Sequence, residues 1–209
     1  MKTLKLKFIA LAILVLGTFG FIACSDEGNT VNSVDSNTTN FKISNELERD
    51  VVAVIVDNQA VPLYDEIILK EMFVNRGLFR EVESIDLVYG FNPEEDNYEA
   101  FLTIVAKEEI NSSLVAVAIE ADLILDGDHL IIGDPEVKPY LFTKHECKGY
   151  NCLSCTFKRE GFLGLRIVGC NPCGGANQPE EPSGCNHSSS SGGGSAVKEA
   201  VNLIKMAAF

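Results

Sequence analysis

Six of the seven cysteines lie between residues 147 and 185, and these side chains offer the clearest chemistry in the chain. Their spacing is C-x4-C-x2-C-x14-C-x2-C-x11-C. Thiols gathered in this way either form disulfides or, as thiolates, bind a metal ion, and the redox state of the compartment decides between the two. In an exported chain, an even number of clustered cysteines predicts a disulfide framework.

The disulfide hypothesis uses all six of these cysteines. A bond inside one CxxC pair would close a very short and strained loop, so pairing between distant cysteines is favoured. We therefore expect bonds that join Cys147, Cys152 and Cys155 to Cys170, Cys173 and Cys185. No cofactor is expected under this hypothesis.

Zinc binding is the alternative, through Cys152, Cys155, Cys170 and Cys173. These residues form CxxC-x14-CxxC around a hairpin-like segment and resemble a zinc ribbon, in which four thiolates hold the ion tetrahedrally. Export argues against this alternative, because the free thiols would have to survive oxidation until the metal arrives.

The N-terminus predicts an export signal over residues 1–23. Lys2, Lys5 and Lys7 precede an apolar run that extends from residue 8 to residue 23. This run is shorter than the roughly 20 residues that a helix needs to span a bilayer, so a cleaved signal is favoured over a membrane anchor.

The end of this signal resembles the lipobox of bacterial lipoproteins. Its residues are Phe21, Ile22, Ala23 and Cys24, with Phe21 at a position where Leu is usual. The resemblance implies that Cys24 becomes the N-terminus and carries diacylglycerol, usually together with an N-linked acyl chain. Two or three acyl chains anchor a protein stably, which a single chain does not. The membrane is then a partner of the protein through Cys24.

Residues 24–40 are expected to form a flexible tether, because the segment after Cys24 is polar and cannot bury a core. Its first residues, Ser25, Asp26 and Glu27, resemble the surface-export signal of Bacteroidota lipoproteins. That resemblance implies display on the outer face of the outer membrane. An ordinary acidic linker that faces the periplasm is the alternative.

The composition bounds the partners and the activity. Seventeen basic and thirty acidic side chains give a net charge of -13, so no nucleic-acid partner is expected, since phosphate binding depends on Lys and Arg. The sequence has no Gly-rich phosphate loop, no nucleophile elbow and no His-Glu-x-x-His helix. We name no catalytic residue and favour a binding or structural protein, with an envelope protein or an extracellular ligand as its partner, over an enzyme.

Residues 41–143 hold most of the apolar residues and predict an α+β domain. A strand is expected at 51–56, and a helix at 64–75, where apolar residues recur at helical spacing among charged ones. Turn-forming segments separate four further expected strands, at 82–90, 98–106, 113–125 and 129–133. One helix followed by a four-strand antiparallel meander is an α+β arrangement.

Residues 144–187 are expected to form a separate cysteine-rich module. Its closing Cys-Asn-His resembles a C-terminal module of exported Bacteroidota proteins, which implies export and a small folded unit but no particular activity. His145 and His187 flank the module and could bind a metal together with Cys147 and Cys185. Exposed polar side chains beside disulfides are the simpler interpretation of these histidines.

Two elements are expected after the module. Residues 188–195 have the composition of a flexible Ser/Gly linker, and residues 196–209 predict an amphipathic helix with Ser195 as its N-cap. One face of this helix carries Val197, Val201, Ile204 and Ala208. We expect the helix to dock on its own domain, with a partner's surface as the alternative.

Overall fold

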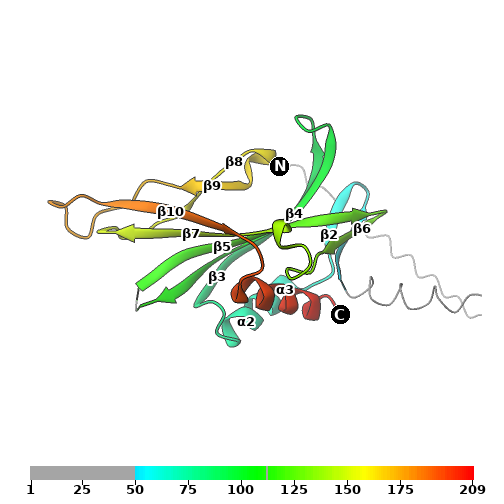
Figure 1. Ribbon diagram of the computed structural model, residues 1–209, viewed down its shortest axis with the longest axis horizontal. Coiled ribbons are helices and arrows are strands. Elements are labelled where there is room, and N and C mark those ends of the chain that lie inside the picture. The colour runs from blue at the N-terminus through cyan, green and yellow to red at the C-terminus, as the bar shows by residue number, and fades with distance from the viewer. Residues whose placement is uncertain (1–49, 112) are drawn as a thin grey trace, which may run out of the picture. The chain divides into compact units, whose positions relative to one another are not determined.

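The computed structural model describes residues 50–111 and 113–209 (Figure 1). The expected export signal, the lipidated Cys24 and the tether lie outside these residues. The described residues form two α-helices, α2 and α3, and ten strands. The strands are β1 (Val51–Val56), β2 (Gln59–Pro62), β3 (Glu81–Asn92), β4 (Asn97–Ile110), β5 (Ser113–Asp126), β6 (His129–Ile132), β7 (Phe142–Tyr150), β8 (Phe157–Glu160), β9 (Arg166–Cys170) and β10 (Gly184–Ser191).

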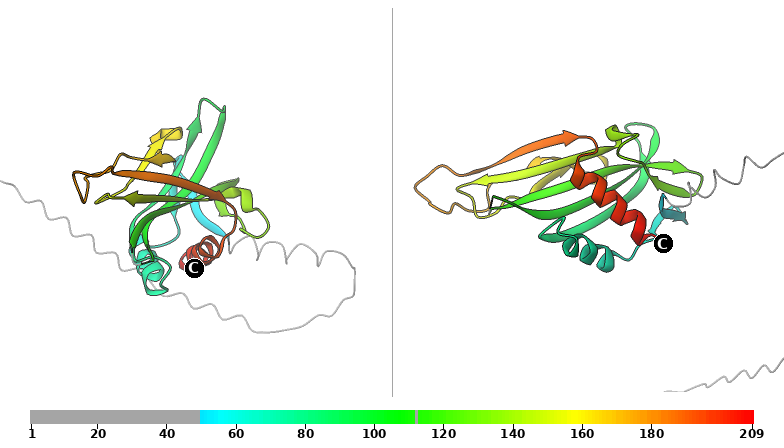
Figure 2. Two further views of the ribbon diagram at one scale, coloured as in Figure 1. Left: turned by 60° about the vertical axis from the view of Figure 1, so that its left-hand side comes forward. Right: turned by 60° about the horizontal axis from the view of Figure 1, so that its bottom comes forward.

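The main sheet is organised around β5. One edge of β5 pairs with β4, which in turn pairs with β3. The other edge pairs with β7 through residues 116–121 and with β6 through residues 123–126. Beyond β5 the antiparallel sheet therefore divides into two branches, one continuing to β10 and the other to β1 and β2, and it curls as Figure 2 shows.

Both faces of the central strands are covered. On β4, Leu102 and Ile104 belong to the main core, whereas Val105 belongs to a smaller cluster on the opposite face. Side chains alternate between the two faces of a strand, so covering both faces leaves a nearly continuous run of buried residues. Figure 1 shows α2 and α3 on one side of the sheet and β8 and β9 on the other.

Helix α2 (Glu66–Asn75) begins at Asp65, whose carboxylate accepts hydrogen bonds from the backbone N–H groups of Ile67 and Ile68. This N-cap satisfies donors that the first turn leaves free. The buried residues Leu69 and Phe73 pack in the main core and attach the helix to the sheet.

Helix α3 (Ser195–Ala207) docks on its own sheet. Its buried residues Val197, Val201 and Ile204 join the main core, together with Leu203. The predicted N-cap was wrong: Gly194 holds that position, and no side chain caps the helix. Packing of its apolar face therefore positions α3 without help from a capping side chain.

The structure confirms the α+β class, with strands more abundant than expected. Helix α2 occupies most of the predicted helix, and β3, β4, β5 and β6 form the predicted antiparallel meander. The fold differs at the cysteine-rich segment, which is not an appendage, because β7 and β10 are strands of the main sheet. Residues 188–191 of the expected linker belong to β10. None of the helices in the described residues is long and apolar enough to cross a membrane.

Replacing Leu203 with Ala tests the docking of α3. Leu203 is 1% exposed, so the truncation leaves a cavity and should lower the free energy of unfolding by about 2–4 kcal/mol. The neighbouring Asn202 is exposed, and Asn202→Ala should change the free energy by no more than about 0.5 kcal/mol. Urea denaturation measures both, and equal effects would contradict the docked helix.

Candidate functional site

The hairpin of β8 and β9 covers the outer face of the sheet, which we define as the face opposite the two helices. Ile167 of β9 is 6% exposed and packs with Val105 and Ala118 of the sheet. Phe157 of β8 is partly buried against the same cluster. This apolar contact is small, and polar and covalent contacts supply the rest of the attachment.

Arg166 of β9 is the centre of the polar contacts. Its guanidinium lies 2.6 Å from a carboxylate oxygen of Asp122, 3.2 Å from Glu99 and 3.5 Å from Glu120. It also lies 3.9 Å above the ring centroid of Phe101. One cation on the hairpin therefore faces three carboxylates and an aromatic ring of the sheet, a combination that favours the charged guanidinium.

Glu120 is a buried carboxylate, 6% exposed, beneath this hairpin. Its side chain accepts a hydrogen bond from the backbone N–H of Ile167 at 3.1 Å and lies 3.0 Å from Nε2 of His145. Burial alone would raise the pKa of Glu120, but the contacts with His145, Ile167 and Arg166 together lower it. Glu120 is therefore held as a carboxylate inside the protein.

His145 and His187 lie next to each other on β7 and β10. Nδ1 of His145 is 3.2 Å from Nε2 of His187, and the two rings are inclined by only 17°. His145 is 6% exposed, whereas His187 is exposed. The contacts thus run from the surface at His187 through His145 to the buried Glu120.

All six clustered cysteines of the described chain form disulfides. Each bond joins one of the first three cysteines to one of the last three, as the sequence predicted. The pairs are Cys147–Cys170, Cys152–Cys173 and Cys155–Cys185. The first bond joins β7 of the main sheet to β9 of the hairpin, and so connects two layers covalently. The other two tie the loop between β7 and β8 to the segments beyond β9.

These bonds bear on the two metal hypotheses. The predicted zinc set is divided, because Cys170 is bonded to Cys147 and not placed with the other three cysteines. The structure brings His145 and His187 together, but Cys147 and Cys185, their suggested partners, are both in disulfides. The group of potential metal ligands found in the described residues is instead Cys152, Cys155 and Cys185.

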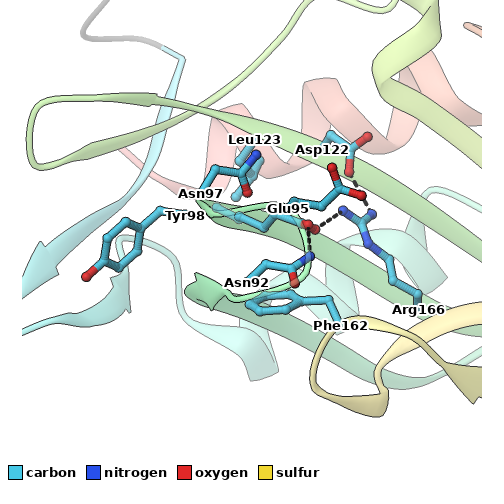
Figure 3. Close-up of a pocket in the computed structure, with 10 residues that line it drawn as sticks. Asn92, Glu95, Asn97, Tyr98, Asp122, Leu123, Phe162 and Arg166 are labelled. Atoms are coloured by element: carbon cyan, nitrogen blue, oxygen red, sulfur yellow. Dashed lines mark hydrogen bonds and ion pairs between the residues drawn. The ribbon is translucent and has the colours of Figure 1, made fainter.

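A pocket of about 430 Å³ opens beside Arg166, and Figure 3 shows the guanidinium directed toward Asp122 at its edge. The amide of Asn92 donates a hydrogen bond to Glu99, which also binds Arg166. The pocket is lined by Asn92, Glu95, Asn97, Tyr98, Glu99, Ala100, Asp122, Leu123, Phe162 and Arg166.

Sequence reasoning missed this pocket and the Arg166 cluster. One signal was available: Glu120 and Asp122 stand two residues apart in an otherwise apolar strand. Residues at that spacing share one face, so the outer face of β5 had to meet a compensating cation.

Comparison of the chain with protein-family models, curated proteins and solved structures gives no match.

Replacing Arg166 with Met should destabilise the protein by about 2 kcal/mol, because it leaves the buried Glu120 without its cation. Adding Glu120→Gln should recover part of this loss, since a neutral amide needs no counter-charge. Lys158→Met is the matched control: its pair with Glu160 is exposed, and the change should cost less than about 1 kcal/mol. If the Arg166→Met variant alone were as stable as the control, the contacts of Arg166 with the carboxylates would not stabilise the hairpin.

Acidification should destabilise the protein in two stages. Desolvation and the neighbouring His145 lower the pKa of His187 below its ordinary 6.5, so the unfolded chain binds more protons there as the pH falls through that value. The lowered pKa of Glu120 adds a second loss below its ordinary 4.5. Urea denaturation between about pH 8 and pH 2 measures both stages. The His187→Gln variant should lack the first stage, and an unchanged profile in that variant would contradict the assignment.

Proposed function

We propose that this chain is a lipid-anchored cell-envelope protein whose disulfide-stapled outer layer carries a ligand-binding pocket. The pairing of all six clustered cysteines in the described chain carries the proposal, because disulfides of this kind persist in oxidising compartments outside the cytosol. The resemblance of residues 21–24 to a lipobox supports the anchor. It agrees with a Bacteroidota-type outer-membrane lipoprotein with a cysteine-rich C-terminal region.

The pocket beside Arg166 supports binding over catalysis. Two of its three carboxylates, Glu99 and Asp122, are paired with Arg166, which makes them weak bases, and no histidine or cysteine lines the pocket. Arg166 is already paired with carboxylates, so it offers little charge to an anion. Glu95 and Asn97 add hydrogen-bonding groups at the rim, beside the rings of Tyr98 and Phe162.

The charge of the lining defines the ligand that this pocket would take. Glu95, Glu99 and Asp122 outnumber the single cation, so an anionic ligand would be repelled. Carboxylates and amides accept hydrogen bonds, and aromatic rings pack against apolar ring faces. The proposed ligand is therefore neutral or cationic, rich in hydrogen-bond donors, and extracellular.

Replacing Cys24 with Ser tests the anchor. Without the acceptor thiol no thioether to diacylglycerol can form, so the variant should move from the membrane fraction to the soluble fraction. Fractionation followed by immunoblotting measures the shift. Cys147→Ser is the matched control, because it removes a thiol of the disulfide layer and should leave membrane association unchanged. Continued membrane association of the Cys24→Ser variant would overturn the lipid anchor.

A further inference from the structure

Two of the disulfides lie against each other. Cys152 Sγ, bonded to Cys173, lies 3.5 Å from Cys185 Sγ and 3.8 Å from Cys155 Sγ, the two sulfurs of the neighbouring bond. The sulfurs of Cys152, Cys155 and Cys185 lie within 4.8 Å of one another, and Cys173 Sγ is bonded to Cys152 Sγ at 2.06 Å. We call these four sulfurs the sulfur cluster. Each belongs to a partly exposed residue; in the third disulfide Cys170 is also partly exposed, whereas Cys147 is 1% exposed.

The spacing of the sulfurs of Cys152, Cys155 and Cys185 is close to that of a zinc site, and Cys173 would complete the set after moving closer to Cys155 and Cys185. Zinc binds thiolates at about 2.3 Å in a tetrahedral array, which places neighbouring sulfurs about 3.8 Å apart. The two measured distances between the disulfides already lie near this value. The two sulfur pairs that are now bonded would have to separate by somewhat less than 2 Å after reduction. We propose that the reduced sulfur cluster binds one Zn²⁺ through Cys152, Cys155, Cys173 and Cys185.

The backbone around the cluster holds its parts together without the disulfides. The N–H of Leu153 donates to the carbonyl of Gly175 at 2.7 Å, and the N–H of Gly174 donates to the carbonyl of Ser154 at 3.2 Å. Main-chain hydrogen bonds thus join the first CxxC turn, residues 152–155, to the two glycines that follow Cys173. A Cβ at Gly149 would come within 3.0 Å of Cys155 Sγ, so the strand beneath approaches the cluster closely. After reduction the thiols remain neighbours, which lowers the entropic cost of binding a metal.

The donor set differs from the one that spacing alone suggests. Cys185 takes the place of Cys170, because the sulfur of Cys185 lies within 4.8 Å of those of Cys152 and Cys155, whereas Cys170 is outside that group. Zinc binding by the four thiolates of the cluster is expected whether or not the Cys147–Cys170 disulfide is reduced as well.

The chemistry balances with a phosphine as the reductant. Each of the two disulfides accepts two electrons and two protons and gives two thiols, while the phosphine takes an oxygen from water and becomes phosphine oxide. Zinc then binds the four thiolates, and their protons are released to the buffer. The site does not depend on the envelope location or on the pocket beside Arg166.

The experiment uses the full chain from Cys24 onward, reduced anaerobically with a phosphine and titrated with Zn²⁺, with Co²⁺ as a spectroscopic probe. We expect one equivalent of metal and the visible spectrum of a tetrahedral tetrathiolate site. Loss of a group that only contacts a metal ligand weakens metal binding roughly 10–100-fold, and Cys185→Ser removes a ligand, so it should weaken zinc binding by more than that. The Cys170→Ser variant should bind zinc as tightly as the wild-type chain. The opposite pattern, or no binding by the reduced wild-type chain, would overturn the proposal.

Alkylation of the wild-type chain gives a second measurement that does not depend on how the variants fold. After reduction without metal, iodoacetamide should label the four thiols of the sulfur cluster, and bound zinc should protect all four. Peptide mass spectrometry identifies the labelled residues. Protection confined to Cys152, Cys155 and Cys173, with Cys185 labelled, would overturn the assigned donor set.

Discussion

The attachment of the β8–β9 hairpin to the outer face of the sheet is the constraint that positions the outer layer, the buried Glu120 and the pocket. The apolar contact beneath the hairpin centres on Ile167, which is too little to hold a two-stranded layer by burial alone. Arg166 adds charge-assisted hydrogen bonds to carboxylates of β4 and β5, and Cys147–Cys170 adds a covalent bond between the layers. The buried Glu120 is tolerable only while this layer stays in place, because Arg166 and Ile167 both come from it.

This constraint also explains how the pocket and the C-terminal strand are positioned. The hairpin supplies Arg166, and the turn before β9 supplies Phe162. If the hairpin came loose from the sheet, the pocket would lose both of these lining residues. Strand β10 lies at the edge of the sheet with mostly exposed side chains, and little apolar burial keeps it there. Its bonds are the ladder to β7, the contact between His187 and His145, and the Cys155–Cys185 disulfide near its start. The cysteines thus replace core packing in a part of the fold that has almost no apolar residues.

Helix α2 and the central strands of the sheet could be predicted from the sequence. The helix at α2 and the four strands from β3 to β6 follow from hydrophobic periodicity and from turn residues, both of which are local signals. The run of serines in β10 carries no alternation, because both of its faces are exposed, so its composition resembles that of a linker. The contacts of Arg166 reach residues 44 to 67 positions away, and although Glu120 and Asp122 signal that a cation is needed, nothing in the sequence near Arg166 identifies it as that cation. The disulfide pairing was predictable as a class, since short-loop bonds within a CxxC are strained, while the individual partners required the fold.

The disulfide between β7 and β9 fastens the outer layer to the sheet. Peptide mapping of the purified protein, digested without reductant after free thiols have been blocked, tests it most directly. Crosslinked peptides are expected for Cys147–Cys170, Cys152–Cys173 and Cys155–Cys185, with none of these cysteines blocked. Cys147 recovered as a blocked free thiol, or Cys170 crosslinked to any cysteine other than Cys147, would contradict this attachment.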